Sequence, residues 1–304
     1  VRGFVGKELL ALITKHPQIK TQWLSSRQLA GQAASAVFDK QQDLDFIIES
    51  LSPTEVAARN TDIIVLALPN GLAEPFVKAI EGSNNTKVLI DLSADYRFSD
   101  DWIYSVPELD HKNLQQASSS KLIKISNPGC YATAMQLALA PIMTLLAGPA
   151  HCFGVSGYSG AGTTPNPKND PAKLKDNIIG YALLEHLHEK EVTVRLKQPV
   201  SFTPHVAAFF RGINMTVQVD FTEPQTSAAL LTRFKKYYAN APLVNCQLEI
   251  PVVTQVINTA NCLIGGFAVS EDGKRATIVS CLDNLLKGAA SQALQNINLA
   301  LKLD

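Results

Sequence analysis

The stretch Ser126-Asn127-Pro128-Gly129-Cys130 places a cysteine where its thiol would be reactive. Residues 121–125, ahead of it, are apolar and β-prone, and residues 131–146 are rich in Ala, Leu and Met at helical spacing. The pattern predicts a strand, a tight turn, and a helix that begins at or just after Cys130. Unpaired N–H groups at a helix start favour the thiolate, which is the nucleophilic form of cysteine. The alternative is a small buried cysteine that fills a strand–helix junction.

A pair of histidines, His186 and His188, supplies candidates for acid/base catalysis. Imidazole titrates near neutral pH and can move protons for a thiolate. Glu191 could orient one of these rings, although a solvated helix charge is the more common role of such a residue. No cysteine or further histidine pair completes a ligand set, so no metal site is predicted. His205 is a second candidate and can equally be a hydrogen-bonded core histidine.

The N-terminal residues indicate a dinucleotide site. Gly3 and Gly6, directly ahead of a helix over residues 7–15, keep the last two glycines of a GxGxxG fingerprint. The strand that should feed this turn is absent from the numbered chain. The next extended segment, residues 21–25, leads into Ser25-Ser26-Arg27, where NAD-preferring folds carry an acidic residue. Two hydroxyls and a guanidinium suit a 2′-phosphate, which predicts NADP, and the alternative is a solvated loop arginine.

Composition limits the classes of partner. The 27 basic and 27 acidic residues cancel, which predicts no nucleic acid and no anionic membrane as partner. No apolar run is long enough to span a bilayer. The five cysteines are odd in number and form no CxxC pair, which argues against a disulfide framework and fits a reducing compartment. A chain of 304 residues suffices for two domains.

The first 125 residues alternate helices and strands. Residues 62–68 and 87–92 are continuous apolar runs, as a parallel sheet covered on both faces requires, and residues 72–81 read as a helix between them. The alternation predicts a doubly wound α/β sheet. Ligands bind such sheets beyond the carboxyl ends of the strands. Turn or polar residues follow each expected strand there: Leu68-Pro69-Asn70-Gly71, Asp91-Leu92-Ser93-Ala94-Asp95 and Asn127-Pro128-Gly129-Cys130.

The pattern changes to β-rich segments after residue 146. Strands are expected at residues 152–156, 205–210, 212–221, 262–269 and 277–281, and helices at residues 226–239 and 283–301. Alternating apolar residues over 214–220 predict a sheet with one face solvated or packed on a partner. Residues 163–175 form a Pro-rich excursion. Arg211, at the end of an apolar run, either binds an anion or is a sheet-edge charge.

These motifs, in this order, resemble those of the N-acetyl-gamma-glutamyl-phosphate reductases over essentially the whole chain. The segments that carry the resemblance are Arg2-Gly3-Phe4-Val5-Gly6, Ala67-Leu68-Pro69-Asn70-Gly71, Asp91-Leu92-Ser93-Ala94-Asp95, Asn127-Pro128-Gly129-Cys130-Tyr131-Ala132-Thr133, Ser156-Gly157-Tyr158-Ser159-Gly160-Ala161-Gly162, Arg211-Gly212-Ile213 and Asp283-Asn284-Leu285-Leu286-Lys287-Gly288. The chain departs from the family at Leu187, where an arginine is usual, and at Lys190, where a proline is usual.

The resemblance implies an α/β fold: a Rossmann-like doubly wound parallel sheet with an inserted α+β catalytic and oligomerisation domain. The NADP-binding domain would span residues 1–129 and 282–304, and the inserted domain residues 130–281. The implied reaction is the NADPH-dependent reduction of N-acetyl-gamma-glutamyl phosphate to N-acetylglutamate 5-semialdehyde and phosphate, in arginine biosynthesis. It would proceed through a thioester on Cys130, with NADP as the cofactor and a small acyl phosphate as the substrate.

The resemblance also assigns roles to residues of this chain. Catalysis falls to Cys130, His188, His186 and Glu191, with His188 favoured as the acid/base. Cofactor contacts are implied for Gly3, Phe4, Val5, Gly6, Ser25, Ser26, Arg27, Leu68, Pro69, Ser93, Ser159, Gly160 and Asn284. Substrate contacts are implied for Asn127, Ser156, Gly157, His205 and Arg211.

Family members are homo-oligomers, so a dimer or tetramer is expected. The expected compartment is the cytoplasm, with the mitochondrial matrix as the alternative. The nearest rival function is a sister reductase, of the aspartate-semialdehyde dehydrogenase or the lysine-pathway type. A thiol hydrolase or acyltransferase without a nicotinamide, and a non-catalytic sensor, remain as more distant rivals.

Overall fold

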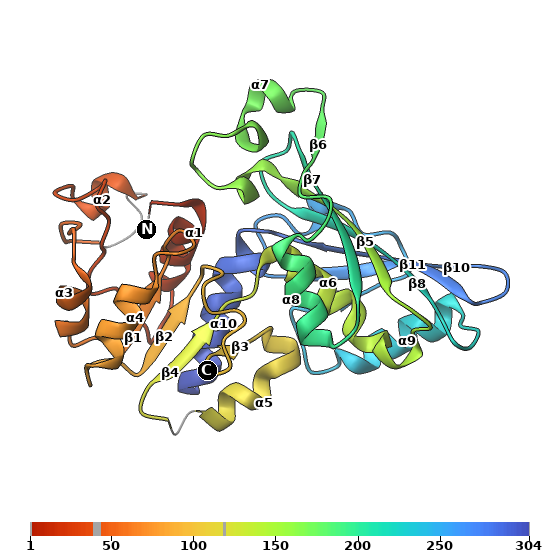
Figure 1. Ribbon diagram of the computed structural model, residues 1–304, viewed down its shortest axis with the longest axis horizontal. Coiled ribbons are helices and arrows are strands. Elements are labelled where there is room, and N and C mark those ends of the chain that lie inside the picture. The colour runs from red at the N-terminus through yellow and green to blue at the C-terminus, as the bar shows by residue number, and fades with distance from the viewer. Residues whose placement is uncertain (1, 39–43, 118–119, 304) are drawn as a thin grey trace. The chain divides into compact units, whose positions relative to one another are not determined.

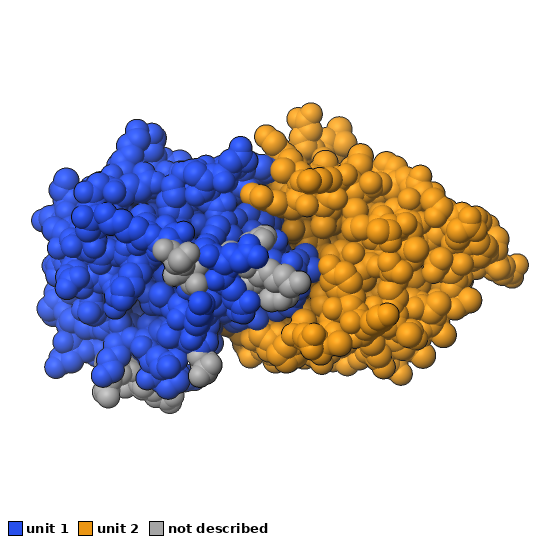
Figure 2. Space-filling model, turned by 90° about the horizontal axis from the view of Figure 1, so that it is seen from below, with its two compact units in different colours: residues 1–128, 289–304 blue, residues 129–288 orange. Residues whose placement is uncertain are grey.

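A computed structural model describes residues 2–38, 44–117 and 120–303, apart from the side chains of residues 111–113. The chain divides into two compact units (Figure 2). Unit 1 comprises residues 1–128 and 289–304, and unit 2 comprises residues 129–288. Within the described ranges, no helix combines the length and apolar character that crossing a membrane requires.

Unit 1 is built on a four-stranded parallel sheet in the order β1-β2-β4-β3 (Figure 1). Its strands are β1 (Ile63–Leu66), β2 (Val88–Asp91), β3 (Ile103–Tyr104) and β4 (Ile123–Ser126). Its helices are α1 (Phe4–Ile13), α2 (Ala34–Val37), α3 (Pro53–Ala58), α4 (Glu74–Glu81), α5 (Pro107–Ala117) and α10 (Ser291–Leu301). Helix α4 connects β1 to β2 and α5 connects β3 to β4, as crossovers between parallel strands require.

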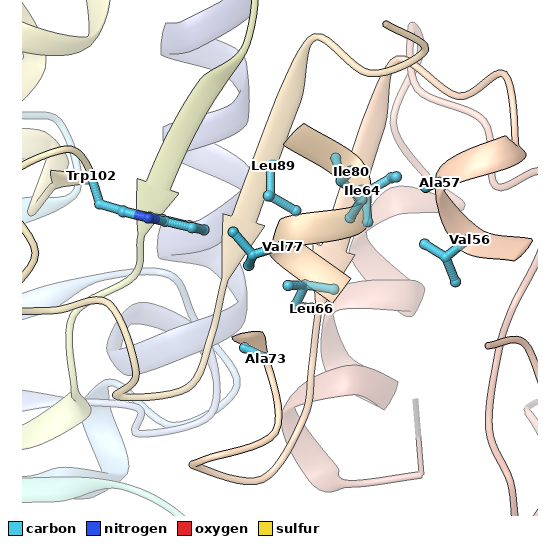
Figure 3. Close-up of a cluster of buried hydrophobic side chains, with 9 residues drawn as sticks. All are labelled: Val56, Ala57, Ile64, Leu66, Ala73, Val77, Ile80, Leu89 and Trp102. Carbon is cyan, nitrogen blue, oxygen red and sulfur yellow. The ribbon is translucent and has the colours of Figure 1, made fainter. Parts of the chain in front are cut away.

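Helices cover both faces of this sheet. On one face, Val77 and Ile80 of α4 pack against Leu89 of β2 in a buried cluster to which α3 and β1 also contribute (Figure 3). On the other face, α10 contacts β2 and packs against α1 and α5. Every residue of β2 is buried, as its continuous apolar sequence requires. The doubly wound, Rossmann-like sheet is therefore confirmed.

The edge of the sheet at β1 is less regular than the sequence indicates. The segment before Ser25 is extended but forms only a single bridge, between Ser25 and Glu49. A cavity of about 500 Å³ lies here, lined by residues of α1, residues 18–25, β1 and α10. The strand expected ahead of the glycine turn has no counterpart among the described residues and stays a prediction.

Unit 2 contains a mixed seven-stranded sheet in the order β6-β7-β5-β8-β11-β10-β9 (Figure 1). Its strands are β5 (Ala150–Gly157), β6 (Ile178–Gly180), β7 (Val200–Ala207), β8 (Ile213–Asp220), β9 (Val244–Cys246), β10 (Cys262–Val269) and β11 (Arg275–Leu282). Its helices are α6 (Cys130–Leu139), α7 (Pro171–Leu174), α8 (Leu187–Leu196) and α9 (Ser227–Tyr237).

The predicted alternation along β8 is confirmed. Ile213, Met215, Val217 and Val219 are buried, whereas the residues between them are partly or fully exposed. Helix α6 contacts β8 and β11, α8 contacts β7, and α9 contacts β9 and β10. The buried face of the sheet is therefore the face on which these helices pack.

Three predicted elements differ from the structure. Helix α6 ends at Leu139 and continues as a 3₁₀ helix, Ala140–Leu145, because Pro141 has no N–H to continue the α-helical ladder. The strand expected over residues 205–210 is β7, which ends at Ala207. The closing helix starts only at Ser291, because the Asp283 carboxylate accepts hydrogen bonds from the N–H groups of residues 285 and 286 and a π-helical turn follows.

Candidate active site

Cys130 is the first residue of α6, and Gly129 is its N-cap. Cys130 is half-buried, whereas the rest of α6 is buried. A Cβ built on Gly288 would lie 2.6 Å from the Cβ of Cys130. Any side chain at position 288 would therefore push against the cysteine, which makes glycine necessary there. The thiol stands at the start of a helix, where a negative charge is stabilised.

The other cysteines are poor nucleophiles. Burial raises the pKa of the Cys246 thiol to about 11 and that of Cys281 to about 12, and it raises the pKa of Cys152 further. Cys262 is fully buried. The thiols of Cys152, Cys246 and Cys281 stay protonated at neutral pH and Cys262 is covered, so Cys130 is the cysteine best placed to react.

His186 caps helix α8. Its Nδ1 accepts a hydrogen bond from the backbone N–H of His188 at 3.1 Å, which requires Nδ1 to be unprotonated. Burial and the positive charge of Lys168 lower the pKa of His186 to about 4. His186 is therefore a neutral capping acceptor at physiological pH. The ring of His188, in the first turn of α8, lies 4.8 Å from that of His186 and 6.0 Å from that of Tyr131, between ring centroids.

Two carboxylates fix α8 in unit 2. Glu191 is fully buried, and its Oε1 accepts a hydrogen bond from the N–H of Gly129 at 2.9 Å. Glu189 Oε2 accepts one from the N–H of Phe202 in β7 at 2.7 Å. Glu191 is therefore not a solvated helix charge. It joins the turn that presents Cys130 to the helix that presents the histidines.

Two tyrosines that the sequence motifs do not assign to the site, Tyr131 and Tyr181, lie close to the thiol. Tyr131 donates a hydrogen bond to the carbonyl of His205 at 2.5 Å, and its side chain hydrogen-bonds that of Tyr181. Burial, and then the negative charge of Cys130, raises the pKa of Tyr181 and adds to the rise at Tyr131. Both phenols therefore remain protonated. In the sequence, the position of Tyr131 directly after Cys130 is the one indication that a tyrosine lies at this site.

His205 and Arg211 both have partners within unit 2. The ring of His205 packs on Phe153, with 4.4 Å between ring centroids, and its backbone carbonyl is the group that meets Tyr131. Arg211 Nε lies 2.6 Å from Oδ2 of Asp283, which is fully buried. The charge of Arg211 is thus balanced within the fold.

The glycine loop after β5 is held by Asn284. The Asn284 amide donates to Ser159 Oγ at 2.9 Å, and its oxygen accepts a backbone hydrogen bond at 2.6 Å. A Cβ on Gly157 would lie 2.6 Å from backbone atoms of the neighbouring turn, so only glycine allows this close approach. A Cβ on Gly160 would lie 2.9 Å from Ser156 Oγ. The structure therefore brings Ser156, Ser159, Gly160 and Asn284 together.

In unit 1, the start of α1 offers room for a phosphate. Gly3 is the N-cap of α1, and a Cβ built on it would meet no described atom within 4 Å. Phe4, Val5 and Gly6 form the first turn. Open space in front of a helix N-terminus fits a pyrophosphate. Arg27 is exposed, whereas Ser25 Oγ accepts a hydrogen bond from the N–H of residue 51 at 3.1 Å.

The loops that follow β1 and β2 are joined at one edge of the unit 1 sheet. Asp95 accepts hydrogen bonds from the N–H groups of Gly71 at 2.6 Å and of Ala73 at 3.1 Å. Ser93 donates to the buried carboxylate of Asp91 at 2.6 Å, and burial raises the pKa of Asp91. Ser93 and the turn after Leu68-Pro69 therefore lie at the same edge of this sheet.

Asn127, expected to contact substrate, is buried within unit 1. Its amide donates to the carbonyl of Ala289 at 3.3 Å and accepts from Asn296 at 3.2 Å. Its backbone carbonyl accepts a hydrogen bond from Arg97 at 3.0 Å. These bonds tie the end of β4 to the chain around α10.

Two family models match the chain. One is described as "Semialdehyde dehydrogenase, NAD binding domain" and matches residues 1–117. The other is described as "Semialdehyde dehydrogenase, dimerisation domain" and matches residues 130–284. This chain is 51% identical to a protein named N-acetyl-gamma-glutamyl-phosphate reductase from Xanthomonas campestris pv. campestris (strain B100). It is 48% identical to a protein of the same name from Xylella fastidiosa (strain M23). Both alignments cover 100% of this chain, with 94% and 91% of the two relatives.

Solved structures support the fold. A probable aspartate-semialdehyde dehydrogenase from Pseudomonas aeruginosa matches with a TM-score of 0.79 over 99% of this chain and 96% of its own. Aspartate semialdehyde dehydrogenase II from Vibrio cholerae, complexed with ASA, matches with a TM-score of 0.77 over the same shares. At 16% identity, both show a common fold alone.

We expect alkylation to select Cys130. Iodoacetamide at pH 7 should label Cys130 at least tenfold faster than the other cysteines, because Cys152, Cys262 and Cys281 are buried and the pKa of the half-buried Cys246 is raised to about 11. Peptide mapping by mass spectrometry of the folded protein gives the rate at each thiol. Equal rates at Cys130 and Cys246 would contradict this account of the site.

The cap formed by His186 predicts a pH-dependent stability. Because the folded pKa of about 4 lies below the ordinary 6.5, the unfolded chain binds the proton more readily. The stabilisation is complete above pH 6.5 and is lost as the pH falls towards 4. His186→Asn keeps a capping acceptor but no titration, so its Tm should fall less between pH 7 and 4.5. His151→Asn, at an exposed site, is the control, and equal slopes for His186→Asn and wild type would refute the prediction.

Proposed function

We propose that this chain, which belongs to the N-acetyl-gamma-glutamyl-phosphate reductases of the semialdehyde dehydrogenase family, works through a thioester on Cys130. The reaction is the reduction of N-acetyl-gamma-glutamyl phosphate to N-acetylglutamate 5-semialdehyde and phosphate, a step of arginine biosynthesis. The observation that carries the proposal is the half-buried thiol at the start of α6, held beside a histidine-bearing helix by Glu191.

In the first step, the Cys130 thiolate attacks the acyl carbon of the substrate. A C–S bond forms, and the bond between that carbon and the phosphate oxygen breaks, so phosphate leaves with the bonding electron pair. His188 takes the thiol proton beforehand, because His186 is a neutral cap and its Nδ1 is already used. Dividing one difficult displacement into two covalent steps is the usual gain from such a nucleophile.

In the second step, the thioester is reduced and released. When bound, the nicotinamide cofactor supplies a hydride to the thioester carbon. The resulting tetrahedral oxyanion on Cys130 collapses, the C–S bond breaks, and the aldehyde leaves as the thiolate is restored. His188 stabilises the oxyanion by donating its proton towards the oxygen. Glu191 acts as a positioning residue, because it bonds the turn and touches no reacting atom.

Residues of unit 1 would hold the adenine-nucleotide half of the cofactor. Gly3, Phe4, Val5 and Gly6 offer a helix N-terminus to the pyrophosphate, and Ser93 and the turn after Leu68-Pro69 lie at a carboxyl edge of the sheet. The family model supports a nicotinamide cofactor. We assign NADP because the exposed Arg27 is a guanidinium suited to a 2′-phosphate.

The match of residues 130–284 to a dimerisation model supports a homo-oligomer. A dimer or tetramer is the proposed state. The bacterial sources of the relatives favour the bacterial cytoplasm over the mitochondrial matrix. The match to an NAD-binding model speaks against a hydrolase that would use Cys130 without a nicotinamide.

The reverse reaction tests the proposed function. N-acetylglutamate 5-semialdehyde, phosphate and NADP⁺ are mixed, and NADPH absorbance is followed. Wild type should produce NADPH, and Cys130→Ser should produce none, because the hydroxyl is not activated as the thiolate is. His188→Asn should lower kcat by roughly 10²- to 10⁴-fold, the usual loss of an acid/base group.

The matched control is His186→Asn, which keeps the capping acceptor and should stay within about threefold of wild type in kcat. A loss at His186→Asn equal to that at His188→Asn would reverse the assignment of the acid/base. Wild type that is active only with aspartate semialdehyde would move the substrate to the sister enzymes.

The choice of cofactor is tested at Arg27. Arg27→Ala should raise KM for NADP⁺ roughly 10- to 100-fold and leave KM for NAD⁺ unchanged, because only NADP⁺ carries the 2′-phosphate. Lys20→Ala, another exposed cation of unit 1, is the control. If Arg27→Ala raised the KM values for NADP⁺ and NAD⁺ equally, Arg27 would not recognise the 2′-phosphate.

A further inference from the structure

The Pro-rich excursion between β5 and α8 holds a lysine in a fixed place. Lys168 lies in a 3₁₀ turn, Pro167–Asn169, whose cap is Asn166. Asn166 Oδ1 accepts the N–H of Lys168 at 2.9 Å, and Asn169 Oδ1 accepts the N–H of Asn166 at 2.8 Å. Asn169 also donates to the carbonyls of Gly162 and Thr164, at 2.9 and 2.8 Å. The turn is therefore a closed hydrogen-bonded unit and not a loose loop.

This turn brings the ammonium group of Lys168 to the cluster of side chains around Cys130, which comprises Tyr131, Tyr181 and His186. Lys168 Nζ lies 4.3 Å from the ring centroid of Tyr181, which is within cation–π range. Tyr181 hydrogen-bonds Tyr131, the neighbour of Cys130, and its ring lies 5.7 Å from that of His186. The positive charge of Lys168 helps to lower the pKa of His186, and the negative charge of Cys130 helps to raise the pKa of Tyr181. One aromatic ring thus has the cation and the thiolate as neighbours.

Lys168 carries a charge that no ion pair among the described residues balances. Among the ion pairs of the described residues, none joins Lys168 to a carboxylate, although its side chain is half-buried. Arg211 differs, because the buried Asp283 neutralises it. A tyrosine face attracts an ammonium group but supplies no negative charge. A partly desolvated cation beside a nucleophile is suited to an anionic group that arrives with the substrate.

We propose that Lys168 binds an oxyanion of the substrate, either its carboxylate or its phosphate, and orients the acyl carbon towards Cys130. This inference rests on the proposed function. Tyr181 holds the ammonium group in place before substrate arrives, so that little side-chain entropy is lost on binding. The anion-binding group then lies in the Pro-rich excursion and not in the sheet. Arg211 stabilises the fold through its ion pair with Asp283.

The reverse reaction separates the two oxyanions, because the semialdehyde carries the carboxylate and phosphate is a free co-substrate. KM for each is measured at saturating NADP⁺ in Lys168→Met, Lys168→Arg and Lys173→Met. Lys173 is an exposed lysine of the same excursion and serves as the matched control. Lys168→Met should raise one of the two KM values roughly 10- to 100-fold, as loss of a charge-assisted hydrogen bond does.

A rise confined to the KM for phosphate would assign Lys168 to the phosphate, and a rise confined to the KM for the semialdehyde would assign it to the carboxylate. Either result, with partial recovery in Lys168→Arg and no change in Lys173→Met, supports the proposal. Both KM values within twofold of wild type would overturn it. So would an equal rise in both that Lys168→Arg does not relieve, because that pattern indicates a structural role.

A second measurement does not depend on activity. The His186 pKa, followed by NMR of its ring, should rise in Lys168→Met, while burial still keeps it below its ordinary value, and should stay near 4 in Lys168→Arg, with an unchanged Tm for both variants. An unchanged His186 pKa in Lys168→Met would place the ammonium group away from the cluster and defeat the proposal. Failure of wild type to make NADPH would count against the proposed function, whereas altered KM values can come only from an active enzyme.

Discussion

The hydrogen bond from the N–H of Gly129 to the buried carboxylate of Glu191 is the contact on which the candidate active site depends. A charged group without access to water is tolerated in a fold only where polar partners meet it, so this bond restricts where α8 can lie. The hydrogen bond constrains both of the segments that it joins. It holds the turn that presents Cys130, and it holds the first turn of the helix that carries His186 and His188.

The sheet of unit 2 supplies the support for this arrangement. Helix α8 is fastened to β7 through Glu189, and Tyr131 of α6 reaches the carbonyl of His205 in the same strand. Gly154 of β5 leaves room for the tyrosine ring, since a Cβ there would lie 2.6 Å from it. The two helices that carry Cys130 and His188 are thus both hydrogen-bonded to β7, which limits independent movement of either helix.

Much of this structure could be predicted from the sequence, and what could not has identifiable causes. Continuous apolar runs fixed the covered strands of unit 1, and Pro128-Gly129 before an Ala-rich segment located the start of α6 at Cys130. The sequence favours a solvated charge at Glu191, because its partner is a backbone N–H and residue types do not show which backbone groups bond to a side chain. The meeting of Lys168 with Tyr181 depends on how the excursion folds back, and local patterns carry no information about that.

The burial of the other thiols has a consequence for oxidative chemistry. Peroxide attacks a thiolate that it can reach, so sulfenic acid should form first at Cys130. Cys152, Cys262 and Cys281 are buried, and burial raises the pKa of the half-buried Cys246 thiol to about 11, so these four thiols are poorly suited to attack that sulfenic acid and close an internal disulfide. Repair then falls to external thiols such as glutathione. Oxidative inactivation of this reductase would therefore be a single event at Cys130, the proposed nucleophile, reversible until the sulfur is oxidised further.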